Sequence, residues 1–180
     1  MMRRLSIILS CGFLFACADA PINDGLDPFA PKIFKEGSTP LPKEVPDGKN
    51  LVVFRVSNNT PFQFGIDAKS IEIGKDGVTR YVISILGPNG TVNSFYEGIR
   101  CESFEWKLYG TLDANQVWQP NPLSTWQPIR DRIVNRYQAA LALGPFTGVG
   151  GMCDFKIQEN NIATILKKLN PGFDQGANYK

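Results

Sequence analysis

The strongest constraint on the fold is the run of residues 78–86, in which apolar side chains alternate along an extended chain. Successive side chains of a strand point to opposite faces, so this run presents two apolar sets. The sets are Tyr81, Ile83 and Ile85 on one face and Val78, Val82 and Leu86 on the other. Because a strand that is apolar on both faces is typical of a sheet covered on both sides, we expect a buried central strand here.

Shorter runs rich in β-branched and aromatic residues surround this strand and predict further strands. They are residues 51–56, 62–67 and 70–73 before it, and residues 91–100, 104–108 and 117–119 after it. Glycine-containing turns at residues 74–77 and 87–90 join neighbouring runs as hairpins. The sheet is therefore expected to be antiparallel.

Two helices are predicted after the strands. Residues 130–143 and 161–169 carry apolar side chains at a period of about 3.6 residues. Gly144 and Pro145 end the first helix, and residues 170–172 end the second. Strands followed by helices predict an α+β fold, with an antiparallel sheet, two C-terminal helices packed on one side and one structural disulfide.

The N-terminus has the pattern of an export signal. Arg3 and Arg4 precede the apolar residues 5–16, a run shorter than the roughly 20 residues that span a bilayer. The segment Leu14-Phe15-Ala16-Cys17 matches a lipobox, so we expect cleavage after residue 16 and lipid attachment to Cys17. Two or more acyl chains anchor a protein stably. The alternative is a soluble periplasmic protein that is cleaved nearby.

Domain boundaries follow from composition. We expect a lipoprotein signal peptide at residues 1–16, a lipid-anchored linker at 17–48, a folded domain at 49–170 and a tail at 171–180. The linker holds six of the thirteen prolines and shows no apolar periodicity, which is typical of a semi-rigid spacer. The remaining roughly 130 residues are an ordinary size for one domain.

Cysteine use fits an oxidising compartment. Of the four cysteines, Cys11 leaves with the signal peptide and Cys17 is assigned to lipid. Cys101 and Cys153 remain as an even pair, and we expect them to form a disulfide. A redox or metal-binding pair is the alternative, although the chain contains no CxxC spacing.

Composition also argues against several classes of function. The chain has no histidine, which removes the commonest general base and most zinc sites, and we expect no cofactor and no metal. Loss of Arg3 and Arg4 lowers the basic residues from 19 to 17, which equals the 17 acidic residues. Such a balance gives no electrostatic basis for binding nucleic acid.

Several motifs in the middle of the chain occur together. They are FGID at residues 64–67, DGVTRY at 76–81, EGIRC at 97–101, Trp118, Trp126 and the late Cys153. In this combination the chain resembles the family of the cryptic neisserial protein, which belongs to Gram-negative envelopes. The function of that family is unknown, so the resemblance implies a location and no mechanism.

The same motifs suggest a binding site. Arg80, Tyr96, Glu97, Arg100 and Trp126 would combine a balanced set of charges with aromatic rings, a combination suited to a small polar ligand or a peptide.

A purely structural interpretation of the same motifs stays open. In it, Arg100 pairs with Glu97, Glu102 or Asp67, and Gly98 marks a bulge or a close approach of the backbone.

Two functions from different classes are compatible with the sequence. The first is a non-enzymatic envelope lipoprotein at the inner leaflet of the outer membrane, facing the periplasm and binding an envelope protein or a cell-wall component. The second is a hydrolase of envelope glycan that uses carboxylates among Glu97, Glu102 and Glu105. We expect the first, and we assign no catalytic residue.

Overall fold

The structure is a computed structural model that describes residues 33–130, 136–145 and 150–172. It divides the chain into two compact units, Met1–Phe34 and Lys35–Lys180. The predicted signal peptide, Cys17 and all but two residues of the predicted tail lie outside the described residues. The second unit contains all the strands and both helices of the described residues.

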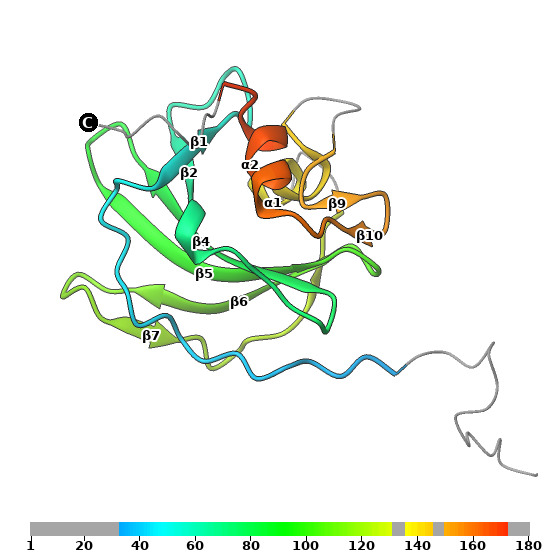
Figure 1. Cartoon of the computed structure of the whole chain (residues 1–180). Coiled ribbons are helices and arrows are strands. Elements are labelled where there is room, and N and C mark those ends of the chain that lie inside the picture. The colour runs from blue at the N-terminus through cyan, green and yellow to red at the C-terminus, as the bar shows by residue number, and fades with distance from the viewer. Residues whose placement is uncertain (1–32, 131–135, 146–149, 173–180) are drawn as a thin grey trace, which may run out of the picture. The chain divides into compact units, whose positions relative to one another are not determined.

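One antiparallel sheet dominates this unit (Figure 1). Its strands are β1 (Leu51–Phe54), β2 (Gln63–Asp67), β3 (Glu72–Ile73), β4 (Val78–Leu86), β5 (Val92–Arg100), β6 (Glu105–Leu112), β7 (Trp118–Pro120) and β8 (Gln127–Pro128). The main order is β1-β2-β4-β5-β6-β7, while β3 also pairs with β4 and β8 also pairs with β6. Two short strands, β9 (Cys153–Asp154) and β10 (Ile157–Gln158), form a separate hairpin.

The predicted central strand is confirmed with its predicted bounds. β4 pairs with β5 along its full length, and β2 and β3 together pair with much of its other edge. The short 3-10 helix Ala68–Ser70 separates β2 from β3. There the Ser70 hydroxyl accepts a hydrogen bond of 2.7 Å from the Val82 backbone N–H, which replaces a ladder bond between the strands.

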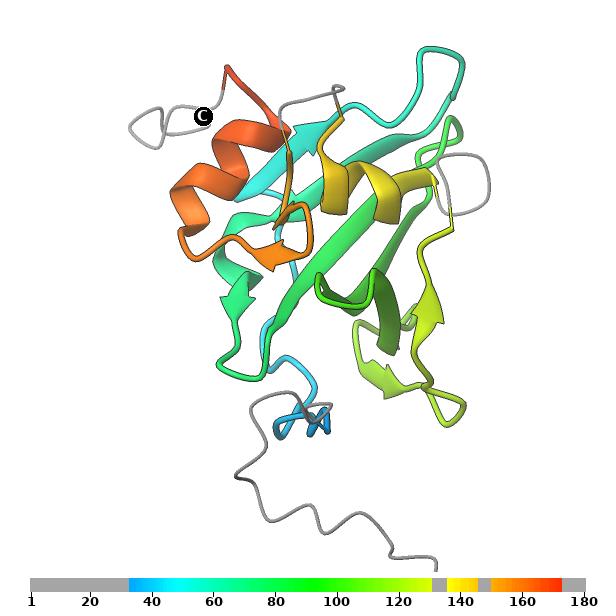
Figure 2. The same cartoon turned by 90° about the vertical axis from the view of Figure 1, so that its right-hand side faces the viewer.

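Both helices lie on the same side of the sheet (Figure 2). They are α1 (Arg136–Leu143) and α2 (Ile162–Leu169). The Asn161 side chain caps α2 by accepting a hydrogen bond from the Thr164 backbone N–H. The buried side of α2 consists of Ile165, Leu166 and Leu169, which belong to one apolar core with Tyr81 and Ile83 of β4. This arrangement confirms the predicted α+β fold.

The opposite face of the sheet is covered by residues 35–46, which we call the strap. The strap contains no helix or strand, yet it belongs to the same compact unit as the sheet. The folded unit thus begins further toward the N-terminus than residue 49. The apolar residues on both faces of β4 predicted that both sides of the sheet are covered. The helices cover one side, and the strap, which has no regular secondary structure, covers the other.

Several shorter elements differ from the prediction. Neither β8 nor the β9–β10 hairpin was among the predicted strands. Each of these strands has only two residues, which is too short to show an alternating pattern. Part of the predicted first helix, residues 131–135, lies outside the described residues.

Candidate functional site

The strap crosses the sheet face opposite the helices (Figure 1). Its Leu41 packs in a small apolar cluster whose other members are Val82, Tyr96, Tyr109 and Trp118. A Cβ atom at Gly110 would lie 2.7 Å from Leu41 Cδ2, so glycine at this position makes room for the strap. Trp118 Nε1 donates a hydrogen bond of 3.0 Å to the carbonyl oxygen of Glu44. The middle of the strap is thereby fixed by one apolar contact and one polar contact.

Three donors surround the carboxylate of Glu36 near the start of the strap. Lys107 Nζ donates at 2.8 Å, the Tyr109 hydroxyl at 2.7 Å and Trp126 Nε1 at 3.3 Å. Partial burial acts to raise the pKa of Glu36, but these hydrogen bonds and the charge of Lys107 outweigh it and lower the pKa. We call Lys107, Tyr109 and Trp126 the carboxylate cradle, because its geometry suits an ionised carboxyl group.

A buried ion pair holds the next part of the strap. Arg80 Nη2 lies 2.6 Å from Asp76 Oδ2, and Nη1 lies 3.2 Å from Oδ1, so the pair is bidentate. Arg80 Nε donates to Thr39 Oγ1 at 2.9 Å, and the Gly37 backbone N–H donates to Asp76 at 2.8 Å. The hydrogen bonds from Arg80 are the main reason why the pKa of Asp76 falls to about 2. The pair therefore stays ionised and binds the strap at the Gly37 backbone N–H and at the Thr39 side chain.

Cations and aromatic rings alternate in a row across this face. Arg100 lies over the ring of Trp126 at 5.8 Å, and Lys107 lies 5.7 Å from the same ring. Lys107 also lies 5.3 Å from the centre of the Tyr109 ring, and Arg80 lies 5.9 Å from it. Such contacts strengthen when they are shielded from water. The strap shields the Arg80 end, where the arginine is only 2 % exposed.

A β-bulge places Tyr109 in this row. Tyr96 pairs with Gly110 while Glu97 pairs with Leu108, so Tyr109 is the extra residue on β6. Gly98 lies against it, and a Cβ atom there would be 2.9 Å from Tyr109 Cε2. The atoms nearest to this Cβ position belong to the side chains of Tyr109 and Val78, so the close approach at Gly98 involves side chains and not the backbone that was predicted.

The structure separates the five residues of the predicted binding site. Arg80, Tyr96, Arg100 and Trp126 share the strap face, whereas Glu97 belongs to the helix face. Tyr96 and Glu97 are neighbours in one strand, so their side chains must point to opposite faces. Neighbours in the sequence of a strand therefore cannot both belong to one site on a single face of the sheet.

The ion-pair partner of Arg100 also differs from the carboxylates that the sequence predicted. Arg100 Nη2 pairs with Glu105 Oε2 at 3.2 Å, and Arg100 Nε donates to Ser103 Oγ at 2.6 Å. Glu105 lies directly opposite Arg100 in the β5–β6 pairing, on the same face. The strand register therefore decides the partner, in preference to the carboxylates that are nearer in sequence.

Glu97 is the most unusual group on the helix face. It is 1 % exposed, and its carboxyl accepts hydrogen bonds from Tyr137 at 2.6 Å and from Tyr81 at 3.1 Å. Burial raises its pKa to about 7 and outweighs the two hydrogen bonds, which lower it. A group enclosed in this way cannot touch a substrate, so the geometry gives no support to catalysis by Glu97.

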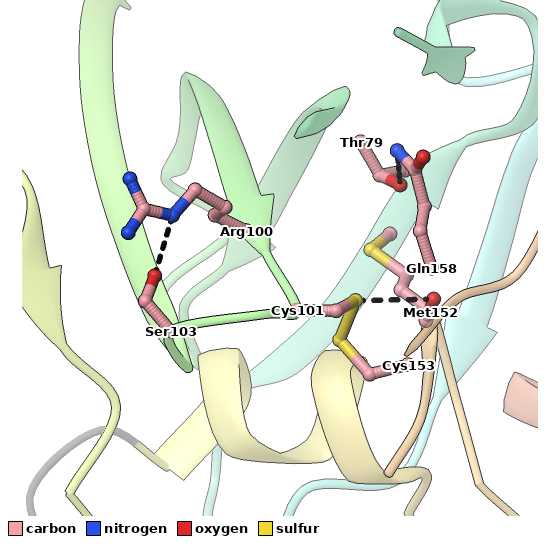
Figure 3. The surroundings of a disulfide bond; sticks show 7 residues. All are labelled: Thr79, Arg100, Cys101, Ser103, Met152, Cys153 and Gln158. Carbon is pink, nitrogen blue, oxygen red and sulfur yellow. Dashed lines mark hydrogen bonds between the residues drawn. A yellow bond between two sulfur atoms is a disulfide. The ribbon is translucent and has the colours of Figure 1, made fainter. Parts of the chain in front are cut away.

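The predicted disulfide is confirmed. Cys101 and Cys153 are bonded, with their Cα atoms 5.4 Å apart, and both are buried (Figure 3). The bond joins the end of β5 to β9. Nearby, Gln158 Nε2 donates to Thr79 Oγ1 at 3.0 Å, which ties β10 to the start of β4. The β9–β10 hairpin is thus attached to the sheet at two points.

Open clefts in the described part of the unit include the following two. The first has a volume of about 300 Å³ and lies between the strap and β2, lined by Pro42, Lys43, Glu44, Asp67, Lys69, Ser70 and Val82. The second, of about 260 Å³, is lined by Val53, Phe54, Arg55, Leu169, Asn170 and Pro171. The first is mainly polar and fits a small polar group or a side chain.

The described residues contain no cluster of three or more acidic, cysteine or histidine side chains arranged to hold a metal ion. Within the same ranges, no helix has the length and apolar character needed to cross a membrane.

Comparison with known proteins places the chain in a family. No curated protein and no solved structure matches it. Residues 29–170 match the CNP1-like family, whose members are uncharacterised proteins of Gram-negative type, in agreement with the family resemblance predicted from the motifs. The match includes the strap, the sheet and both helices, and it covers most of the sequence. The chain therefore belongs to the CNP1-like family.

Proposed function

We propose that this chain is a non-enzymatic envelope lipoprotein. In this proposal, lipid on Cys17 anchors it in the inner leaflet of the outer membrane, and the domain faces the periplasm. There it binds an envelope protein or a cell-wall component. The export signal, the lipobox and the disulfide support the location.

The strap is the observation that carries the proposal. Because the cradle and the Asp76–Arg80 pair hold the strap on the sheet, the tether would be residues 18–34. A chain of about 17 residues spans at most about 60 Å. The domain would therefore stay near the membrane, presenting a restricted set of surfaces to the periplasm. Such an arrangement suits a tethered binding module.

The cleft between the strap and β2 is the binding surface we assign. Lys43 and Lys69 supply positive charge there, and Glu44 and Asp67 supply negative charge. Burial and the nearby charges of Asp47 and Glu44 raise the pKa of Asp67, while its hydrogen bond from the Lys69 backbone N–H opposes the rise. A cleft with both charge signs suits a polar partner such as a peptide segment or a sugar with amide groups.

The glycan hydrolase alternative finds no support in the geometry. It needs two carboxyl groups about 5–10 Å apart in a cleft that is open to substrate. Glu97 is enclosed, and Glu105 is paired with Arg100. No observation favours that function over binding.

Two measurements test the proposal. Mass spectrometry of the mature protein should find acyl groups on Cys17, and a Cys17→Ser variant should lack them and leave the membrane fraction. An unmodified N-terminus beyond residue 17 would contradict the lipoprotein proposal and favour the soluble periplasmic alternative.

The second measurement concerns the cleft. A photo-reactive amino acid at Lys69, which is exposed at the cleft, should yield a discrete cross-linked partner in living cells. The same probe at exposed Asn115, in the turn between β6 and β7, is the control. Equal and diffuse labelling at both positions would contradict binding at the cleft.

A further inference from the structure

The β9–β10 hairpin presents apolar side chains to solvent. Its turn joins Asp154 to Ile157, and we call residues 154–157 the tip. Phe155 is 86 % exposed and Ile157 is 72 % exposed, although both are large apolar residues. Asp154 and Lys156 are also exposed, and their charges cancel. The tip is therefore a small projection with no net charge that exposes two large apolar side chains.

Phe155 has a backbone conformation that a large side chain rarely adopts. Its φ is +54°, in the left-handed region that glycine and asparagine occupy most easily. Two-residue hairpin turns normally use those residues for this reason. Folding alone would favour glycine here, so the exposed aromatic ring calls for a role outside the fold.

The base of the hairpin is held firmly while the tip is exposed. Cys153 is bonded to Cys101, and Gln158 donates to Thr79 (Figure 3). The Glu159 backbone N–H also donates to the Met152 carbonyl oxygen at 2.9 Å. A tip mounted in this way keeps a fixed direction relative to the sheet, which lets it orient the domain on contact.

The start of the strap lies at the same end of the sheet as the hairpin. Gly37 bonds to Asp76, just before β4, and Thr39 bonds to Arg80. Gln158 of the hairpin bonds to Thr79, which is next to Arg80. Further along, the strap reaches Trp118 at β7, so it runs away from this end. The N-terminal end of the strap, from which the chain continues toward Cys17, is therefore bound at the same end of β4 as the hairpin.

We infer that the tip docks on the phospholipid surface to which the chain is tethered, with Phe155 and Ile157 inserted at the interface. This inference rests on the proposed lipid anchor. The tether holds the tip at a high effective concentration near the bilayer, so a small apolar area is enough for contact. Lys156 can extend its amine toward the head groups while its methylenes stay at the interface. Because the tip has no net charge, its insertion should depend little on salt.

The test uses the full lipidated protein in vesicles of phosphatidylethanolamine with a minor fraction of phosphatidylglycerol. A diazirine amino acid replaces Phe155 in one sample and Leu123 in another. Leu123 is a matched control, since it is 82 % exposed and apolar but lies between β7 and β8. We expect about tenfold more lipid adducts at position 155 than at position 123.

A second variant keeps the test independent of the probe. Phe155→Gly relieves the backbone conformation, so this variant should unfold at the same temperature as the wild type or higher. With Ile157→Ser added, lipid labelling by a probe at Lys156 should fall several-fold, whereas Leu123→Ser should leave it unchanged. Unchanged labelling in the double variant would overturn the inference.

The outcomes separate the inference from the proposed function. Acylated Cys17 with equal lipid labelling at positions 155 and 123 overturns the docking alone. A discrete protein cross-linked at 155 in cells also overturns it, because the tip would then bind a protein partner. Absence of acyl groups on Cys17 overturns the proposed anchor, and the docking with it.

Discussion

The two faces of the sheet are covered in different ways. On the helix face, α1, α2 and the β9–β10 hairpin bury a continuous apolar core, with a disulfide at its edge. On the strap face, an irregular segment covers a small apolar cluster together with ion pairs and a row of cations and rings. Burial of apolar area stabilises the first face, and directional polar contacts fix the second.

The contrast appears in two adjacent residues of β4. Tyr81 is buried in the apolar core and donates a hydrogen bond to Glu97. Arg80 points to the other face and pairs with Asp76. Glu97 has a raised pKa and Asp76 a lowered one, so the two faces respond to pH in opposite directions. One face of the sheet thus packs on an apolar core, whereas contacts on the other face require ionised groups.

The largest expected effect is on the helix face. Replacing Cys101 and Cys153 with serine removes a bond between residues 52 positions apart. The free energy of unfolding should fall by about 4 kcal/mol, because the unfolded chain gains freedom. Urea titration measures the loss, and the wild type treated with a reductant is the matched control. A loss below about 1 kcal/mol would show that the hairpin is held without the bond.

The next effect is on the strap face. Asp76→Ala leaves the Arg80 guanidinium, whose side chain is 3 % exposed, without its carboxylate partner. We expect a loss of about 3 kcal/mol in unfolding free energy, because an unpaired charge stays buried. Adding Arg80→Met should recover part of it, and a double-mutant cycle measures the coupling. If the two single losses simply add, the pair does not hold this face.

The smallest effect concerns the carboxylate cradle. Glu36→Gln keeps an oxygen acceptor but removes the charge that Lys107 faces, so the start of the strap should loosen by about 1 kcal/mol. Trypsin should then cut after Lys43 about fivefold faster, since cleavage follows the open population. Ser38→Ala is the control, because Ser38 lies on the strap, is exposed and is distant from the cleaved bond. Equal rates in both variants would mean that the cradle does not retain the strap.

Local patterns were enough to predict most of the sheet. The alternation in residues 78–86 predicted β4 and its burial on both faces. The periodic positions in residues 161–169 predicted α2, and the count of cysteines predicted the disulfide. All of these depend on residues near one another in sequence or on simple elimination.

The strap could not be predicted in this way. Its contacts join Glu36 to residues 71 to 90 positions away, and no helical or strand period marks it. Its prolines indicated a semi-rigid spacer and gave no sign of the surface that receives it. The binding cluster failed to assemble for a related reason: strand alternation and a bulge decide which face each side chain occupies.

The most direct test of the two-face account is the free energy of unfolding measured from about pH 2 to about pH 8. The folded pKa of Glu97 is about 7, above the ordinary 4.5. Its contribution is complete below pH 4.5 and should decline by about 3 kcal/mol as the pH rises through 7. The folded pKa of Asp76 is about 2, below the ordinary 3.8, so its contribution is present above pH 3.8 and is lost as the pH falls toward 2.

The account predicts a maximum of stability at about pH 4 to 5, with a decline on each side. Glu97→Gln should reduce the decline on the alkaline side only, and Asp76→Asn should reduce the decline on the acid side only. Glu102→Gln, at an exposed position next to the disulfide, should change neither. If both variants flatten the same side of the profile, or if the wild type loses no stability above about pH 5, the two faces are not held by opposite chemistry.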